Sequence, residues 1–389
     1  MIPQFDVQYG FRDFLVALGA LRAENLGGDF RLPGFEGSDV QFLPTRRGRE
    51  ALYLLLKSLD LPPLAKIGLP LYTCTVVVQT VAAAGLTPVF LDADAETFGL
   101  SLSDLQAKAD GLDGLILVHS FGYPADYQRV RSILENKPII EDCAHGVGSK
   151  YCGQPLGSLG YGSLFAFGLF KPFSTSTGGC IVTKDGALAE RLRSAIKAAP
   201  CETTRQELEQ AFDSLRLGLA FRRPAYHLLS HLFERPREPD AGGALPKRIV
   251  SEFLMMRRTD RSVLMARLRT WSLQRNGDFW KQVRDHVPAG WWVPPEPHYG
   301  EWNHFLLPIR APNPKAGARA VTRLRAQGVA AAQLYRNSAS TARLFGYTGD
   351  CPEAELLAES VIVFPCYPSL SLTDRRKLLR CLVDLGELG

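Results

Sequence analysis

Short apolar runs alternate with longer amphipathic stretches between residues 45 and 193. The apolar runs have the length and composition of buried strands, whereas the amphipathic stretches repeat their apolar positions with the period of a helix. The leucines of residues 49–59, for example, recur at helical spacing and predict a helix there. Because strands that alternate with helices build parallel sheets, this region predicts an α/β fold with a mostly parallel central sheet.

The same pattern predicts the individual elements. Strands are expected at residues 66–70, 88–92, 115–118, 138–142, 163–167 and 180–183, and further helices at residues 74–84, 104–109, 125–134 and 187–198. Gly85 directly follows the first of these helices, in the position where glycine often ends a helix. Together with residues 201–246, these elements predict one large domain over residues 40–245, preceded by an N-terminal segment, residues 1–39.

The character of the chain changes after Cys201. Residues 201–246 predict a divergent helical insertion that ends in a Pro/Gly-rich surface loop, and a domain boundary falls there. Residues 248–283 predict one or two long helices. A small C-terminal α/β domain is expected within residues 246–389, with strands at 305–309 and 361–364 and helices at 318–327 and 374–385.

Composition and charge narrow the class of protein. The chain has 389 residues, of which 46% are hydrophobic and 22% charged, which is typical of a globular protein. Its net charge of +5 is spread along the chain and forms no basic block, so we expect neither a nucleic-acid nor a membrane partner. No stretch approaches the roughly 20 apolar residues of a membrane span.

The cysteines and the first residues point to a cytoplasmic protein. The eight cysteines include no C-x-x-C pair, so we expect reduced thiols in a reducing compartment, and no metal site is predicted. The first residues lack a basic stretch followed by an apolar one, so a secretory signal is not expected.

Two polar residues follow predicted strands at the edge where ligands of parallel sheets gather. Asp142 ends the strand at 138–142, and Lys171 follows the strand at 163–167. Taken singly, they could be a capping aspartate and an exposed lysine. Taken together, they suit pyridoxal phosphate, which needs an amine for its aldehyde and a carboxylate to keep its ring nitrogen protonated.

Several blocks of the chain, in order and in register, resemble the DegT/DnrJ/EryC1/StrS aminotransferases, a family of fold-type-I pyridoxal-phosphate enzymes. The blocks are residues 45–52, 70–74 with 84–92, 118–126, 139–148 (IIEDCAHGVG), 157–163 and 165–179. The resemblance implies a homodimer with active sites at the subunit interface. It also implies transfer of an amino group, from glutamate, to a nucleotide-linked keto-sugar, as in polysaccharide biosynthesis.

The resemblance also implies roles for individual residues. Lys171 would form the Schiff base with pyridoxal phosphate and move protons, and Asp142 would pair with the ring nitrogen. The remaining cofactor contacts would come from His145, Gly48, Arg49 and Cys74, and the substrate contacts from Tyr72, Tyr335 and Arg336. His145 could instead be a structural cap, and residues 48 and 49 could be a plain helix start with solvated side chains.

The chain departs from the family pattern at three places. Ala166 stands where the family has a phosphate-binding serine, and Cys74 stands where it often has an aromatic residue on the ring. The family's Asn-x-Arg block is reduced to a remnant around residues 255–258. These departures favour a non-catalytic scaffold as one alternative. The other alternative is a dehydratase-like enzyme that uses the pyridoxamine form, against which the presence of Lys171 speaks.

Overall fold

The computed structural model of the chain describes residues 1–22, 31–233, 254–270 and 277–388. Its centre is a seven-stranded sheet of order β1-β9-β8-β5-β4-β2-β3. These strands are β1 (Gln41–Thr45), β9 (Gly179–Thr183), β8 (Gly162–Ala166), β5 (Ile139–Asp142), β4 (Gly114–Val118), β2 (Lys66–Pro70) and β3 (Thr87–Leu91). Strands β3, β2, β4, β5 and β8 are parallel, and β9 is antiparallel to both of its neighbours.

The strand order creates a crevice at the carboxyl ends of the central strands. From β2 the chain runs to β3 on one side and then crosses to β4 on the other side. Ligands of open α/β sheets bind where the direction of winding reverses in this way. Asp142 pairs with Val118 of β4 and with Leu164 of β8, so the ends of these strands lie at one level.

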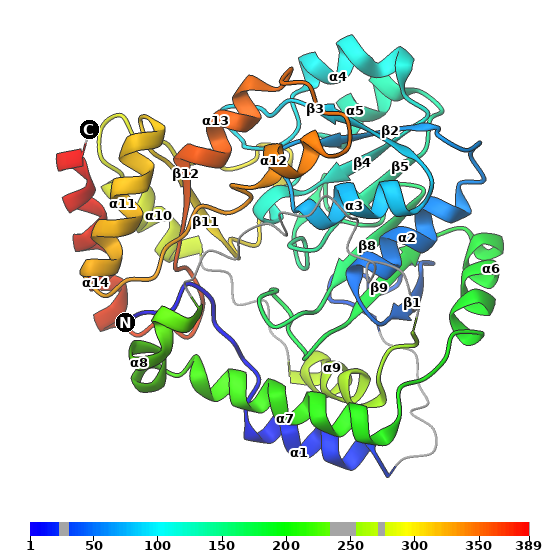
Figure 1. Ribbon diagram of the computed structural model, residues 1–389, viewed down its shortest axis with the longest axis horizontal. Coiled ribbons are helices and arrows are strands. Elements are labelled where there is room, and N and C mark those ends of the chain that lie inside the picture. Colours follow the sequence, from blue (N-terminus) through cyan, green and yellow to red (C-terminus); the bar gives the residue numbers. More distant parts are fainter. Residues whose placement is uncertain (23–30, 234–253, 271–276, 389) are drawn as a thin grey trace.

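Both faces of the sheet are buried under helices. In β4, Ile116 and Val118 contribute to the core on one face, and Leu115 and Leu117 to the core on the other. The first face carries α2 (Gly48–Ser58), α3 (Thr75–Ala83) and α6 (Gly186–Lys197), and the second carries α4 (Leu102–Lys108) and α5 (Tyr127–Leu134) (Figure 1). Burial on both faces explains why β4 is apolar throughout rather than alternating.

A smaller α/β unit lies beside the large sheet (Figure 1). Its antiparallel strands β11 (Leu307–Arg310) and β12 (Val361–Phe364) pack with helices from the last third of the chain. The helices are α10 (Gly277–His286), α11 (Pro314–Ala326), α12 (Ser338–Arg343), α13 (Pro352–Ser360) and α14 (Leu372–Val383). A three-stranded sheet of β10 (Gly300–Glu301), β6 (Lys150–Tyr151) and β7 (Gln154–Pro155) joins the two units.

The N-terminal segment bridges these units. The backbone N–H of Ile2 donates to the carbonyl of Gly328 (2.8 Å), and the backbone carbonyl of Ile2 accepts from the N–H of Ala330 (2.9 Å); both partners lie in the small unit. Helix α1 (Phe11–Ala20) then packs against α7 (Thr204–Ala220) and α9 (Arg258–Thr270). A further helix, α8 (Arg223–Phe233), follows α7. The segment therefore contacts both the small unit and the helices α7 and α9.

The predicted elements can be compared with those observed. The α/β fold with a mostly parallel sheet is confirmed, and β2 and β12 have the predicted bounds. In the described part of residues 248–283 lie α9 and most of α10, which continues to His286. Helices α1, α12 and α13 and strands β1, β6, β7 and β10 were not predicted from the sequence. The predicted boundary at residues 245 and 246 and the Pro/Gly-rich segment at 235–246 lie outside the described residues. Within the described ranges, every helix is too short or too polar to cross a bilayer.

Candidate active site

Lys171 and Asp142 lie on one cavity, of about 310 Å³, at the carboxyl ends of β5 and β8. We call it the lysine cavity. Its walls include most of the residues that the sequence analysis assigned to the cofactor, namely Gly48, Arg49, Cys74, Asp142 and Lys171. Because β5 and β8 are adjacent and parallel, the fold brings the aspartate and the lysine to the same edge of the sheet.

The amine of Lys171 lies against His145. Its Nζ is 3.0 Å from Nε2 of the imidazole. Burial lowers the pKa of Lys171, and the nearby Cys74 and Asp142 oppose this shift. Burial, and then the charge of Lys171, hold the pKa of His145 well below its ordinary value. The imidazole is therefore neutral and can accept a hydrogen bond from the amine, which itself loses a proton more easily than an exposed lysine.

Asp142 is a buried carboxylate, 8% exposed. Its Oδ1 accepts a hydrogen bond from the backbone N–H of Ala144 at 2.9 Å. Burial raises the pKa of Asp142, and the Ala144 amide and the charge of Lys171 partly offset the rise. A desolvated carboxylate of this kind binds a cationic donor strongly, because water competes little for it.

The N-terminus of α2 opens onto the lysine cavity. The residue before it, Arg47, makes no capping hydrogen bond with its side chain, so the first amides of the helix have no side-chain partner there. Arg47 and Arg49 also line the cavity. Gly48 allows the helix start to approach β8, because a Cβ at this position would lie 2.9 Å from the Cβ of Ala166. Free amides, the helix dipole and arginines together favour a phosphate.

Glu50, in the first turn of α2, is buried and close to these arginines. Its Oε1 lies 3.7 Å from Nη1 of Arg47, and its Oε2 has no hydrogen-bond partner in the described part of the chain. Burial raises the pKa of Glu50 to about 7, although Arg47 and Arg46 lower it. The carboxyl group is therefore partly protonated near neutral pH.

A buried ionic network fixes the wall that carries Thr177. The hydroxyl of Thr177 accepts from Nη1 of Arg46 (2.6 Å) and donates to Oδ2 of Asp260 (2.7 Å). Glu202 accepts from Nη2 of Arg46 (2.7 Å) and from Nη2 of Arg257 (3.0 Å). Arg257, which the sequence analysis placed in the remnant of the Asn-x-Arg block, thus contacts its own chain. Glu202 and Asp260 were not predicted from the sequence, because they lie far along the chain from their partners Arg46 and Thr177.

An aromatic cluster lies close to Cys74 and Asp142. The ring of Tyr72 is 5.4 Å from that of Tyr335 and 6.1 Å from that of Phe121. The hydroxyl of Tyr72 is buried and has no partner among the described residues. Burial, then Cys74, raises the pKa of Tyr335 well above its ordinary value. The tyrosines, His145 and the exposed Arg336 are not part of the wall of the lysine cavity.

His119, Glu141 and Cys143 form a buried cluster of metal-ligand types behind the site, with their ligand atoms within 4.8 Å of one another. The Glu141 carboxylate lies 3.1 Å from Nε2 of His119 and accepts the amides of Gly157, Leu159 and Gly160. Nδ1 of His119 accepts from the amide of Ala125 at 3.1 Å. The ligand atoms of His119 and Glu141 already have partners, so these two residues hold the neighbouring loops in place rather than offering free ligands.

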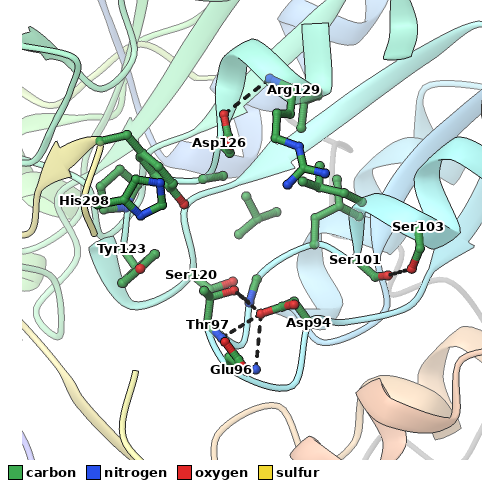
Figure 2. Close-up of a pocket in the computed structure, with 18 residues that line it drawn as sticks. Asp94, Glu96, Thr97, Ser101, Ser103, Ser120, Tyr123, Asp126, Arg129 and His298 are labelled. Atoms are coloured by element: carbon green, nitrogen blue, oxygen red, sulfur yellow. Dashed lines mark hydrogen bonds between the residues drawn. The ribbon is translucent and has the colours of Figure 1, made fainter. Parts of the chain in front are cut away.

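A larger cavity, of about 530 Å³, lies between the loops that follow β3 and β4 and residues 298 and 299 (Figure 2). We call it the loop cavity. Figure 2 shows Arg129 on one side and Asp94 and Thr97 on the other. Oδ1 of Asp94 accepts from the amide (2.8 Å) and the hydroxyl (2.7 Å) of Thr97, and Asp126 accepts from the hydroxyl of Tyr151 (2.8 Å). No residue that the sequence analysis assigned to the site lines this cavity.

The chain is similar in sequence to known aminotransferases. Residues 41–222 match the sequence model of the DegT/DnrJ/EryC1/StrS aminotransferase family. GDP-perosamine synthase of Escherichia coli O157:H7 is 34% identical over 160 residues, which are 40% of this chain and 44% of that protein. UDP-N-acetyl-3-dehydro-alpha-D-glucosamine 3-aminotransferase of Acidithiobacillus ferrooxidans is 25% identical over 83% of this chain and 78% of that protein.

The fold extends beyond the family match. The PLP-form structure of Spr1654 from Streptococcus pneumoniae superposes with a TM-score of 0.75 at 18% identity, covering 99% of this chain and 98% of that chain. The likeness confirms the predicted fold class, that of the fold-type-I aminotransferases, over both units of the molecule.

Proposed function

We propose that this chain, whose residues 41–222 belong to the DegT/DnrJ/EryC1/StrS aminotransferase family, is a pyridoxal-phosphate-dependent aminotransferase acting on a nucleotide-linked keto-sugar. The observation that supports this most is the lysine cavity, where an amine, a buried carboxylate and an uncapped helix N-terminus meet. The names of the relatives support the substrate class, since they include a GDP-perosamine synthase and a UDP-sugar aminotransferase.

The residues of the cavity fit the cofactor. The amides at the start of α2, which has no side-chain cap, suit its phosphate, Asp142 suits its ring nitrogen and Lys171 suits its aldehyde. Cys74 lines the same cavity and would contact the ring. When bound, pyridoxal phosphate supplies an electron sink and a carbon to which amines attach.

Lys171 is the group that moves protons. Its Nζ takes a proton from the reacting carbon of the amino donor and returns one to the reacting carbon of the acceptor. An amine does this near neutral pH only when its pKa is lowered, as burial lowers that of Lys171. His145 accepts a hydrogen bond from the amine and so orients it.

Asp142 holds the proton on the ring nitrogen. Its carboxylate is desolvated and already oriented by the amide of Ala144, so little reorganisation is needed when the proton arrives. The carboxylate should therefore matter more for turnover than for capture of the cofactor.

The aromatic cluster is proposed as the substrate side of the site. Tyr72 has a buried hydroxyl with no partner among the described residues, which a hydroxyl or phosphate of the substrate could satisfy. Tyr335 lies against Tyr72, and the neighbouring Arg336 is exposed and could reach a diphosphate. Glutamate as the donor, a homodimer and a cytoplasmic role in polysaccharide biosynthesis complete the proposal.

One observation favours a second candidate, a non-catalytic member of the family. Ala166 lines the cavity beside Gly48, so the serine hydroxyl that the resemblance implies for the phosphate is missing. Titration with pyridoxal phosphate separates the candidates. An enzyme binds one cofactor per subunit and changes its absorbance when glutamate is added, whereas a scaffold does neither.

The central test is reductive trapping. Borohydride added to the protein with pyridoxal phosphate should attach the cofactor to Lys171, as read by peptide mass spectrometry. Lys171→Ala should abolish trapping and reduce turnover at least about 1000-fold, since the proton-transfer group is lost. Lys184→Ala, at an exposed lysine, is the matched control. An unlabelled Lys171 in the unsubstituted protein would refute the proposal. A screen of nucleotide-linked keto-sugars with glutamate then identifies the acceptor.

A further inference from the structure

Asn303 clamps the turn that carries His145. Its Nδ2 donates to the carbonyl oxygens of His145 (2.7 Å) and Val147 (2.9 Å). This turn follows β5 and is closed by a bond from the amide of Gly146 to the carbonyl of Cys143. Asn303 is 6% exposed and lies on the segment that leads from β10 to β11. Asn303, on the segment that leads into β11 of the small unit, therefore fixes the backbone of His145, whose imidazole contacts the amine of Lys171.

The same asparagine is tied to a second wall of the site. Its backbone N–H donates to Oγ of Ser149 (3.0 Å), and that hydroxyl donates to the carbonyl of Gly122 (2.7 Å). Gly122 has a φ of +80°, and a Cβ there would lie 2.5 Å from Oδ1 of Asn303 and 2.6 Å from the carbonyl oxygen of His145. Only glycine fits at position 122, where Asn303 and the carbonyl of His145 approach the backbone closely. The preceding residue, Phe121, belongs to the aromatic cluster, which is the second wall of the site.

The segment also positions the ring of His145. Oδ1 of Asn303 accepts from the amide of Phe305 (3.0 Å), and the ring of Phe305 lies 5.9 Å from the imidazole. Nδ2 of Asn303 thus fixes the backbone of His145. Oδ1 of Asn303 fixes Phe305, whose ring packs beside the imidazole of His145. Lys171 is the charged group that acts on the imidazole.

We propose that Asn303 is a positioning residue that sets the contact between the imidazole of His145 and the amine of Lys171. Its effect on catalysis rests on the proposed function, because that function gives the amine its role. The contact itself exists without a bound cofactor, so it can be measured in the protein alone.

The test is the titration of His145 by NMR in three variants. Asn303→Asp keeps the oxygen that accepts from Phe305 but loses the donor to His145, and Asn303→Ala loses both. Ser149→Ala removes the hydroxyl bond without changing the asparagine. Asn136→Asp, at an exposed turn, is the matched control for the asparagine substitution. The His145 signal is assigned by its loss in His145→Gln.

We expect the pKa of His145 to rise toward its ordinary value of about 6.5 in both Asn303 variants, because the loosened turn admits water around the imidazole. Ser149→Ala should cause a smaller rise and Asn136→Asp none. In the loaded enzyme, kcat should fall in the Asn303 variants with little change in the KM of the sugar. A lower melting temperature with an unchanged His145 titration would mean a purely structural role and would overturn the inference.

The experiment separates this inference from the proposed function. If the unsubstituted protein bound no pyridoxal phosphate, the proposed function would fail, and the titration of His145 would still decide whether Asn303 sets the contact. If the cofactor bound but the titration did not change in either Asn303 variant, only the inference would fail.

Discussion

The lysine cavity and the loop cavity both lie at the carboxyl ends of strands, yet they differ in how their polar groups are used. The loop cavity is larger, about 530 Å³ against about 310 Å³, but Asp94 and Asp126 in its walls are engaged by Thr97 and Tyr151. The lysine cavity has a desolvated amine, a desolvated carboxylate and a helix N-terminus without a side-chain cap. Desolvated charged groups and an uncapped helix N-terminus, rather than volume, distinguish the candidate site.

The largest expected difference between the cavities concerns their aspartates. Asp142→Asn removes the charge that we propose holds the ring-nitrogen proton, and we expect kcat to fall roughly 100- to 1000-fold, as when one partner of a buried charge pair is lost. The affinity for pyridoxal phosphate should change much less. Steady-state kinetics and cofactor titration measure the two effects.

Asp126→Asn makes the same chemical change in the wall of the loop cavity and is the control. The amide oxygen can still accept from the hydroxyl of Tyr151, but more weakly, so the variant should lose some stability, whereas turnover should remain within about twofold. Equal losses of turnover in the two variants would contradict the distinction between the cavities.

A smaller difference is expected for the arginines. Arg49→Ala removes a cation beside the uncapped start of α2, and the affinity for pyridoxal phosphate should fall roughly 10- to 100-fold, the usual effect of a charged hydrogen bond. Arg129→Ala removes the arginine of the loop cavity and should leave the affinity unchanged. If Arg129→Ala weakened cofactor binding as much as Arg49→Ala, the phosphate would have to be assigned elsewhere.

The smallest effect is on stability and concerns Glu50. Because burial raises the pKa of Glu50 to about 7, the native protein keeps a proton that the unfolded chain releases at lower pH, so stability falls as pH rises toward 7. Glu50→Gln removes this dependence and should raise the free energy of unfolding at pH 8 by about 1 kcal/mol. Urea unfolding between pH 5 and about 8 measures the effect.

Asp94→Asn provides the contrast in the loop cavity. Its carboxylate accepts hydrogen bonds from Thr97, and the amide form weakens them, so stability should fall rather than rise. A Glu50→Gln variant that is less stable than the unsubstituted protein at pH 8 would show that the charged form is stabilised by the arginines after all.

The sequence predicted the large sheet well because its strands are local apolar runs. Strand β2 was predicted with its observed bounds, and the prediction for β4 was one residue shorter than the observed strand. Strand β1 was missed because it is an antiparallel edge strand that contains Pro44 and is only partly buried. Helix α13 begins with Pro352 followed by glutamates, a start signal that could have been used.

The candidate site was predictable only where a motif carries it. Lys171 and Asp142 follow strands and could be found from that position. Asn303 could not, because its partners His145 and Gly122 lie more than a hundred positions earlier and no spacing rule connects them. The contacts of Arg257 with Glu202 likewise depend on how the residues just before α7 and α9, far apart along the chain, come together.

The N-terminal bridge has a consequence for folding during synthesis. Ile2 pairs with residues 328–330, the carbonyl of Pro3 accepts from the hydroxyl of Tyr367, and Asp6 accepts from that of Ser369. These early residues therefore find their partners only after the chain has been made as far as Ser369. The apolar face of α1 lacks α7 and α9 until the chain has been made as far as Thr270, so a chaperone that shields this helix should increase the yield of folded protein.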